Sequence, residues 1–209
     1  LSIRRQRQMC IRDRFTILLI ISCFNIPQDN ENKAMVVTAH KLASDIGLQV
    51  IKDGGNAFDA AISVNYALAV AYPRAGNIAG GGFMVYRTSQ GEIGSLDYRE
   101  KSPLESNTNM YLDDTMNVVE NLSTLGAMAV AVPGTVAGMD AIHQKFGTKS
   151  MIDLLSPSID LAKKGFAINE AQAEKWDQYR DLFLKVNTDS IPYVKSCLLY
   201  TSPSPRDVE

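Results

Sequence analysis

Apolar residues recur at three- and four-residue intervals soon after a polar linker at residues 27–33, and this spacing is typical of one face of a helix. The repeat consists of Leu42, Ile46, Val50 and Ile51. We expect this helix to begin near Thr38 or Ala39. The pair Gly54–Gly55 predicts its end, because glycine commonly terminates helices.

A second helix is predicted over residues 57–71, with Asn56 as its N-cap. This segment is apolar on nearly every side, apart from Asp59, Ser63 and Asn65. Because a helix of that kind is buried on more than one face, we expect it at the centre of the domain. Asp59 falls in the first turn, where a carboxylate commonly accepts hydrogen bonds from free backbone N–H groups, so we assign it a structural role.

Short runs rich in β-prone residues predict strands. Residues 83–86 and 93–98 flank a polar break at residues 88–91, a pattern typical of a hairpin. Further strands are predicted over residues 34–38 and, in a buried position, over residues 127–132.

The last third of the chain is predicted to be mostly helical, after an irregular stretch at residues 100–126. Helices are expected over residues 136–146, 152–164 and 168–184. In the second of them, four side chains should point inward: Leu154, Leu155, Ile159 and Leu161. Helices combined with a hairpin indicate an α+β fold.

Composition places the chain among ordinary globular proteins. Its 209 residues, 45% of them hydrophobic, are enough for a substantial core. The formal net charge is −2, and five arginines lie within residues 1–14, so residues 15–195 are mildly acidic. This distribution argues against a nucleic-acid partner.

The three cysteines, Cys10, Cys23 and Cys197, all lie outside the segment expected to fold. We therefore expect neither a disulfide nor a thiolate metal site. The two histidines, His40 and His143, are too few for a convincing metal site or Ser-His-Asp triad. We expect both at the surface or at its boundary.

Both ends of the chain are predicted to be foreign to the protein. Residues 1–14 and 196–209 resemble translated sequencing-adaptor read-through. Residues 15–24 are too short to span a bilayer but suit the core of a signal peptide. They contain I-I-S-C, which resembles a lipoprotein signal with a lipid anchor at Cys23; a plain secretory signal is the alternative. We expect residues 15–33 to be an export signal plus linker, and the protein to be periplasmic, extracellular or anchored to the cell envelope.

The clearest candidate for chemistry is Arg99, which ends the second hairpin strand. Three glycines, Gly80 to Gly82, precede the first strand and allow the backbone to approach a ligand or another strand closely. They lead into a strand rather than a helix, so they do not fit a dinucleotide-binding loop. A guanidinium held by strand geometry can donate two charge-assisted hydrogen bonds to a carboxylate. From the residues alone, a salt bridge to Asp97 or Glu100, or a solvated strand end, is an equal alternative.

Four motifs follow one another along the chain. They are I-K-D-G-G-N-A-F-D-A-A-I-S-V from Ile51, N-I-A-G-G-G-F-M with L-D-Y-R-E-K-S-P from Asn77, P-G-T-V-A-G-M from Pro133, and L-A-K-K-G-F-A-I-N from Leu161. In order and spacing they resemble the large-subunit region of γ-glutamyltransferases, also called glutathione hydrolases. The resemblance covers about residues 35–187. We therefore expect residues 34–195 to be an N-terminal fragment of that subunit.

The resemblance implies a partial αββα N-terminal nucleophile hydrolase fold. It implies cleavage of γ-glutamyl amides such as glutathione, with transfer of the acyl group to water or to an amino acid or peptide amine. It also implies that Arg99 binds the α-carboxylate of the γ-glutamyl substrate. Neither a metal nor an organic cofactor is implied.

The resemblance further implies a precursor that cuts itself, so that a small subunit begins with a nucleophilic threonine in a Thr-Thr-His type motif. Neither His40 nor His143 follows Thr-Thr, so no threonine of this chain can be assigned that role. We expect no catalytic residue in this chain and no turnover by the chain alone. The small subunit of the same precursor is the expected partner.

Two alternatives stay open. Capsule poly-γ-glutamate transferases and cephalosporin or glutaryl acylases share the implied architecture, keep the glycine loop and use a different pocket. A non-catalytic envelope protein that uses the fold as a binding module belongs to a different class. The absence of a nucleophilic threonine downstream would favour that last alternative.

Overall fold

A computed structural model of the chain describes residues 34–187, and the helices and strands of these residues belong to the second of two units, which begins at Val36. Three predictions therefore lie outside the described residues. They concern the foreign segments 1–14 and 196–209 and the export signal 15–33 with Cys23. Within residues 34–187, no helix combines the length and the apolar character that crossing a bilayer requires.

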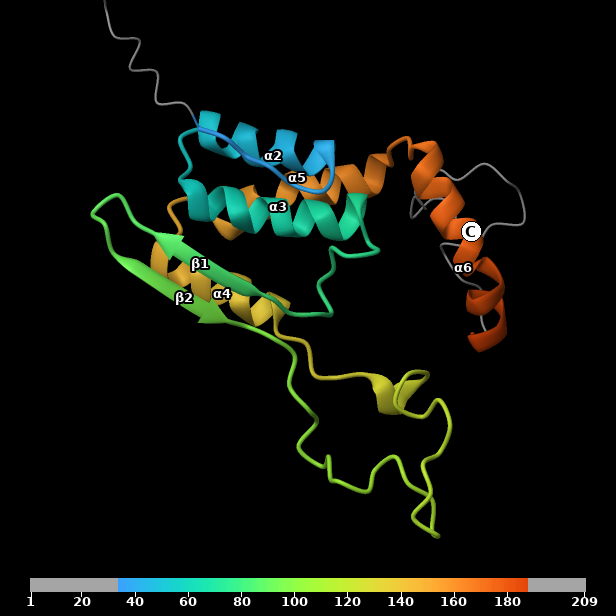
Figure 1. Ribbon diagram of the computed structural model, residues 1–209. Coiled ribbons are helices and arrows are strands. Elements are labelled where there is room, and N and C mark those ends of the chain that lie inside the picture. The colour runs from blue at the N-terminus through green and yellow to red at the C-terminus, as the bar shows by residue number, and fades with distance from the viewer. Residues whose placement is uncertain (1–33, 188–209) are drawn as a thin grey trace, which may run out of the picture. The chain divides into compact units, whose positions relative to one another are not determined.

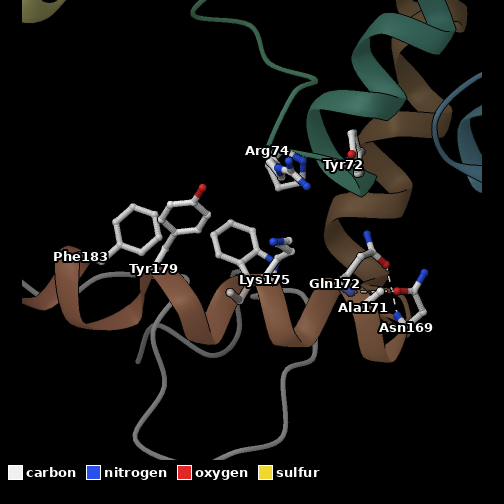
Figure 2. Close-up of a pocket in the computed structure, with 10 residues that line it drawn as sticks. Tyr72, Arg74, Asn169, Ala171, Gln172, Lys175, Tyr179 and Phe183 are labelled. Carbon is white, nitrogen blue, oxygen red and sulfur yellow. Dashed lines mark hydrogen bonds between the residues drawn. The ribbon is translucent and has the colours of Figure 1, made fainter. Parts of the chain in front are cut away.

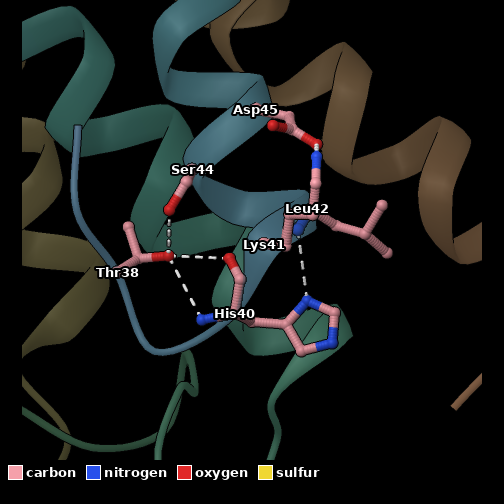
Figure 3. Close-up of polar contacts among 6 residues, drawn as sticks. All are labelled: Thr38, His40, Lys41, Leu42, Ser44 and Asp45. Atoms are coloured by element: carbon pink, nitrogen blue, oxygen red, sulfur yellow. Dashed lines mark hydrogen bonds and ion pairs between the residues drawn. The ribbon is translucent and has the colours of Figure 1, made fainter. Parts of the chain in front are cut away.

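Helix α2 spans Lys41–Lys52, and His40 is its N-cap. The Nδ1 atom of His40 accepts a hydrogen bond from a backbone N–H of the first turn. Figure 3 shows how the Thr38 hydroxyl bonds to both backbone groups of His40 and to the Ser44 hydroxyl. The helix starts later than predicted because Thr38 supports its cap from outside the helix. It ends before Gly54, whose φ of 86° is the left-handed conformation that the glycine pair predicts.

Helix α3 spans Ala57–Ala71, as predicted, and contacts α2 as well as α4 (Thr135–Phe146) and α5 (Met151–Lys164) (Figure 1). Its contacts with three helices confirm that it is the central one. At its first turn, Asn56 and Asp59 form a capping box, which confirms the structural role predicted for the aspartate.

The hydrophobic core lies between these four helices. Its buried members are Val50, Ala60, Ile62, Met139, Ile142 and Leu154. In α5, Leu154 is buried and Leu155 packs against the core, as predicted, whereas Ile159 is 43% exposed. A buried hydrogen bond of 2.9 Å from the Ser63 hydroxyl to the Leu154 carbonyl joins α3 to α5.

Strands β1 (Phe83–Arg87) and β2 (Ile93–Asp97) form the predicted antiparallel hairpin. On one face, the paired residues Met84 and Leu96 pack against the helical core. The opposite face, which we call the outer hairpin face, carries exposed apolar side chains. These are Phe83, Val85 and Ile93, exposed by 64%, 79% and 71%.

The chain continues after α5 into helix α6, Glu170–Val186, which begins two residues later than predicted. Asn169 and Gln172 form a second capping box there. The side chain of Gln172 also donates a 3.0 Å hydrogen bond to the Ala71 carbonyl, which ties the start of α6 to the end of α3.

Two predicted strands are wrong. Residues 34–38 pair with no strand, and the segment expected as a buried strand instead starts with the 3₁₀ helix Ala127–Ala129. Only Val132 enters a bridge, with Lys101, and it is 52% exposed. A strand needs a neighbour that satisfies its N–H and C=O groups, and residues 34–187 supply none along these two runs.

Candidate substrate-binding site

The three-glycine run lies directly against the residues that follow strand β2. A Cβ atom placed on Gly81 would lie 2.7 Å from the Arg99 Cα, and one placed on Gly82 would lie 2.9 Å from the Tyr98 hydroxyl oxygen. Both distances are shorter than real contacts of a Cβ, so a side chain at Gly81 would displace backbone atoms, and one at Gly82 would displace the Tyr98 ring. The run therefore serves close backbone packing, one of the two roles that its sequence predicts.

A second glycine region approaches the same residues from the start of α4. A Cβ atom on Gly134 would collide with the carbonyl oxygens of Tyr98 and Arg99. The Gly80 carbonyl accepts hydrogen bonds from the N–H groups of Gly134 and Thr135, at 2.8 and 3.0 Å. The backbone of Arg99 is thus enclosed between two glycine segments that are bonded to each other. The contribution of Gly134 was not foreseen, because it depends on a contact between segments far apart in the sequence.

Arg99 itself presents its side chain to solvent beside the outer hairpin face. The residue is exposed, and its guanidinium lies 5.4 Å from the centre of the Phe83 ring, a cation–π distance. Its backbone N–H donates a 3.0 Å hydrogen bond to Asp97 Oδ1. Among residues 34–187, Arg99 takes part in no ion pair, so the alternative of a salt bridge to Asp97 or Glu100 is not what the structure contains.

Cavities lie elsewhere in the described part of the chain. One of about 610 Å³ lies between α6 and the turn after α3 (Figure 2). Trp176, Tyr179 and Phe183 line it from α6, and the exposed Arg74 lines it from the turn. Two others, of about 480 and 550 Å³, are also lined without Arg99. The structure therefore places Arg99 next to the glycine run, as the sequence predicts, but on an open surface.

The buried carboxylate of Asp59 holds the connection between α4 and α5. Its oxygens accept hydrogen bonds from the Asn56 N–H at 2.9 Å, the Thr148 N–H at 3.0 Å and the Thr148 hydroxyl at 2.5 Å. Burial is the largest influence and raises the pKa of Asp59, but the hydrogen bonds from Thr148 and its neighbours together lower the pKa below 3.8. Asp59 is therefore an ionised structural group.

Both histidines are half-buried, as expected for boundary positions, and each has a structural contact. His40 caps α2, and the Nε2 atom of His143 lies 2.8 Å from the Lys149 carbonyl. Within residues 34–187, no three side chains of His, Cys, Asp or Glu are grouped closely enough to hold a metal ion.

An α+β scaffold that presents an unpaired arginine beside a glycine run is suited to binding an anion. The sequence profile of the family described as gamma-glutamyltranspeptidase matches residues 43–202. The chain belongs to this family.

Individual relatives agree with the family match. The chain is 51% identical to the glutathione hydrolase proenzyme of Pseudomonas sp. (strain A14) over 156 residues, which is 74% of this chain and 27% of the relative. It thus spans about a quarter of the length of this relative. The crystal structure of the Helicobacter pylori gamma-glutamyltranspeptidase superposes with a TM-score of 0.76 at 46% identity, covering 82% of this chain and 49% of that chain.

Two other kinds of protein are also similar. The acylase ACY 1 proenzyme of Pseudomonas sp. (strain SE83) is 37% identical over 143 residues, 66% of this chain and 26% of the relative. The crystal structure of the Bacillus anthracis transpeptidase enzyme CapD superposes with a TM-score of 0.62 at 29% identity, covering 83% of this chain and 55% of that chain.

Proposed function

We propose that this chain is the N-terminal part of the large subunit of a γ-glutamyltransferase, or glutathione hydrolase. The complete protein cleaves γ-glutamyl amides such as glutathione and transfers the γ-glutamyl group to water or to an amino acid or peptide amine. The observation that carries this proposal is the family match over residues 43–202, together with 51% identity to a glutathione hydrolase proenzyme.

In this proposal, Arg99 binds the α-carboxylate of the γ-glutamyl substrate. Its guanidinium has no partner among the acidic side chains of residues 34–187, so its hydrogen-bond donors are available to a ligand. Its backbone is fixed by Gly81, by Gly134 and by the hydrogen bond to Asp97. A planar guanidinium held in place can donate two hydrogen bonds to the two oxygens of a carboxylate, and it loses little conformational freedom on binding.

The rest of the precursor completes the site. The outer hairpin face exposes Phe83, Val85 and Ile93, and a two-stranded hairpin with one uncovered apolar face is a partial sheet. We propose that a second sheet, to which the small subunit contributes, covers this face in an αββα arrangement. Because Arg99 lies beside Phe83 on that face, covering it would also enclose the guanidinium and form the pocket around it.

The acyl transfer itself needs groups that this chain does not supply. In the proposed mechanism, the nucleophile is a threonine exposed by self-cleavage at the start of the small subunit. Its α-amine takes up the hydroxyl proton as the oxygen attacks the γ-glutamyl carbonyl. The role of this chain is to orient the substrate by its carboxylate, so that the carbonyl meets the nucleophile.

Export of the protein remains a proposal that rests on residues 15–24. Fractionation of cells that produce the complete protein tests it: we expect activity in the periplasm, medium or envelope, and activity confined to the cytosol would contradict it. The comparisons lend no support to the lipid anchor at Cys23.

A second candidate is an acylase activity, which the 37% identity to an acylase proenzyme favours. The complete precursor, purified after self-cleavage, should be compared on γ-glutamyl p-nitroanilide and glutaryl p-nitroanilide, which differ only in the α-amino group. We expect turnover of the γ-glutamyl compound and little of the glutaryl compound. The reverse preference would identify an acylase, and no turnover of either would favour a binding protein.

A further inference from the structure

The ring of Tyr98 fills a socket built from glycines. Its outer end lies over Gly82, where a Cβ atom would come within 2.9 Å of the ring and its hydroxyl. Its inner end lies over Gly138 of α4, where a Cβ atom would come within 2.6 Å of the Tyr98 Cβ. The side chain is half-buried and packs against the hydrophobic core. No residue larger than glycine fits at either wall of the socket while the ring keeps this position.

The socket determines where the next residue points. Successive side chains of an extended chain face opposite sides, so a Tyr98 that points toward α4 sends Arg99 toward the outer hairpin face. The contact of the Arg99 guanidinium with Phe83, a residue of that face, agrees with this alternation. The Tyr98 N–H donates a 3.0 Å hydrogen bond to the Gly82 carbonyl, which extends the pairing of the two strands by one residue. This bond holds the backbone of Tyr98 in the register that directs its ring toward α4.

We propose that Tyr98 is a positioning residue for substrate binding: its ring, locked in the glycine socket, sets the place and direction of the Arg99 guanidinium. This inference rests on the proposed function of Arg99. It adds that carboxylate affinity depends on a buried side chain that never touches the substrate.

The hydroxyl of Tyr98 is not part of this role. Burial raises the pKa of Tyr98, so the hydroxyl stays neutral. The ring therefore acts through shape and packing. Phenylalanine keeps that shape, whereas leucine fills much of the volume but cannot reach both Gly82 and Gly138.

Tyr86 provides a matched control in the same hairpin. It pairs with Gly94, and a Cβ atom on that glycine would come within 2.5 Å of the Tyr86 ring. The Tyr86 ring packs on Phe58 and Phe146, at the end of the hairpin away from Arg99. Replacing Tyr86 by leucine thus disturbs a similar tyrosine–glycine contact of the same sheet without touching the segment that carries the arginine.

The test compares Tyr98→Leu, Tyr98→Phe, Tyr86→Leu and Arg99→Ala in the complete precursor, with γ-glutamyl p-nitroanilide as substrate. Self-cleavage into two subunits, followed on a denaturing gel, reports folding. We expect Tyr98→Leu to raise KM about ten- to a hundredfold while kcat changes less than about threefold, because a displaced guanidinium weakens binding of the substrate and of the transition state alike and leaves the nucleophile in place. Tyr98→Phe should restore the wild-type KM, and Tyr86→Leu should leave KM near it.

A double variant separates this inference from the proposed function. If Tyr98 acts through Arg99, then Tyr98→Leu should raise KM no further in the Arg99→Ala background. An unchanged KM in Tyr98→Leu, an equal rise in Tyr86→Leu, or failure of Tyr98→Leu to self-cleave would overturn the positioning role, even where Arg99→Ala raises KM. An unchanged KM in Arg99→Ala would instead overturn the proposed function.

Discussion

Replacing Asp59 by alanine is the change that should destabilise the helical core most clearly. The residue is fully buried, and its carboxylate accepts three hydrogen bonds of 3.0 Å or less, from Asn56 and Thr148. These bonds join the first turn of α3 to the connection between α4 and α5. Alanine would leave the two backbone N–H groups and one hydroxyl without a partner.

The magnitude follows from these contacts. A buried donor without an acceptor costs about 1–3 kcal/mol, and relaxation of the Thr148 hydroxyl and entry of water recover part of that cost for three donors. We therefore expect Asp59→Ala to lower the free energy of unfolding by about 3–5 kcal/mol. Thr148→Val removes one donor and leaves the carboxylate with its other partners, so it should cost only about 1 kcal/mol.

The assay is urea unfolding of the complete protein, followed by the helical signal in far-UV circular dichroism. Asp45→Ala is a matched control, because Asp45 is an exposed helical carboxylate paired with Lys41 at 2.5 Å. An exposed pair of this kind is worth less than about 1 kcal/mol, so its loss should barely move the urea midpoint. Equal midpoints for Asp59→Ala and Asp45→Ala would refute the reasoning.

Four further predictions can be checked separately. The fold lowers the pKa of Asp59 below 3.8, so the ionised carboxylate stabilises the folded state fully above that pH, and this stabilisation is lost as the pH falls through the lowered pKa. Urea midpoints measured against pH should show this loss in the wild type and not in Asp59→Asn. Gly91→Ala should cost only about 1–2 kcal/mol of unfolding free energy, since its φ of 88° disfavours a side chain while a Cβ there would meet no atom within 4 Å. Gly138→Ala should be more destabilising in the same urea assay, because its Cβ would collide with Tyr98. The chain of 209 residues alone should release no p-nitroaniline from γ-glutamyl p-nitroanilide, and measurable release would contradict the prediction that it holds no catalytic residue.

Local signals predicted the helices and the hairpin well. The spacing of Leu42, Ile46 and Val50, the cap at Asn56 and the turn before Ile93 are each decided by residues close together in the sequence. Such elements need no distant partner to be recognised. The position of Arg99 beside the glycine run was also predictable, because both belong to one hairpin.

The wrong strands and the glycine socket depend on contacts that a local pattern does not contain. Residues 127–132 are β-prone, but a strand forms only beside a neighbour, and the described residues offer a single bridge through Val132. The closeness of Gly134 and Gly138 to Tyr98 arises only when α4 packs on the hairpin. The open surface around Arg99 could not be predicted for the same reason, because the sequence of one segment does not show which other segments cover it.

The most direct test of the account is to remove the arginine and the substrate carboxylate separately and together. The complete, self-cleaved protein and its Arg99→Ala variant should be assayed on γ-glutamyl p-nitroanilide and on 4-aminobutanoyl p-nitroanilide, which lacks the α-carboxylate. Two charge-assisted hydrogen bonds are worth roughly 3–5 kcal/mol, so either removal should lower kcat/KM by about a hundred- to a thousandfold or more. In the Arg99→Ala variant, removing the α-carboxylate from the substrate should then lower kcat/KM only slightly further. A variant that still prefers the γ-glutamyl compound as strongly as the wild type would show that Arg99 does not bind the carboxylate.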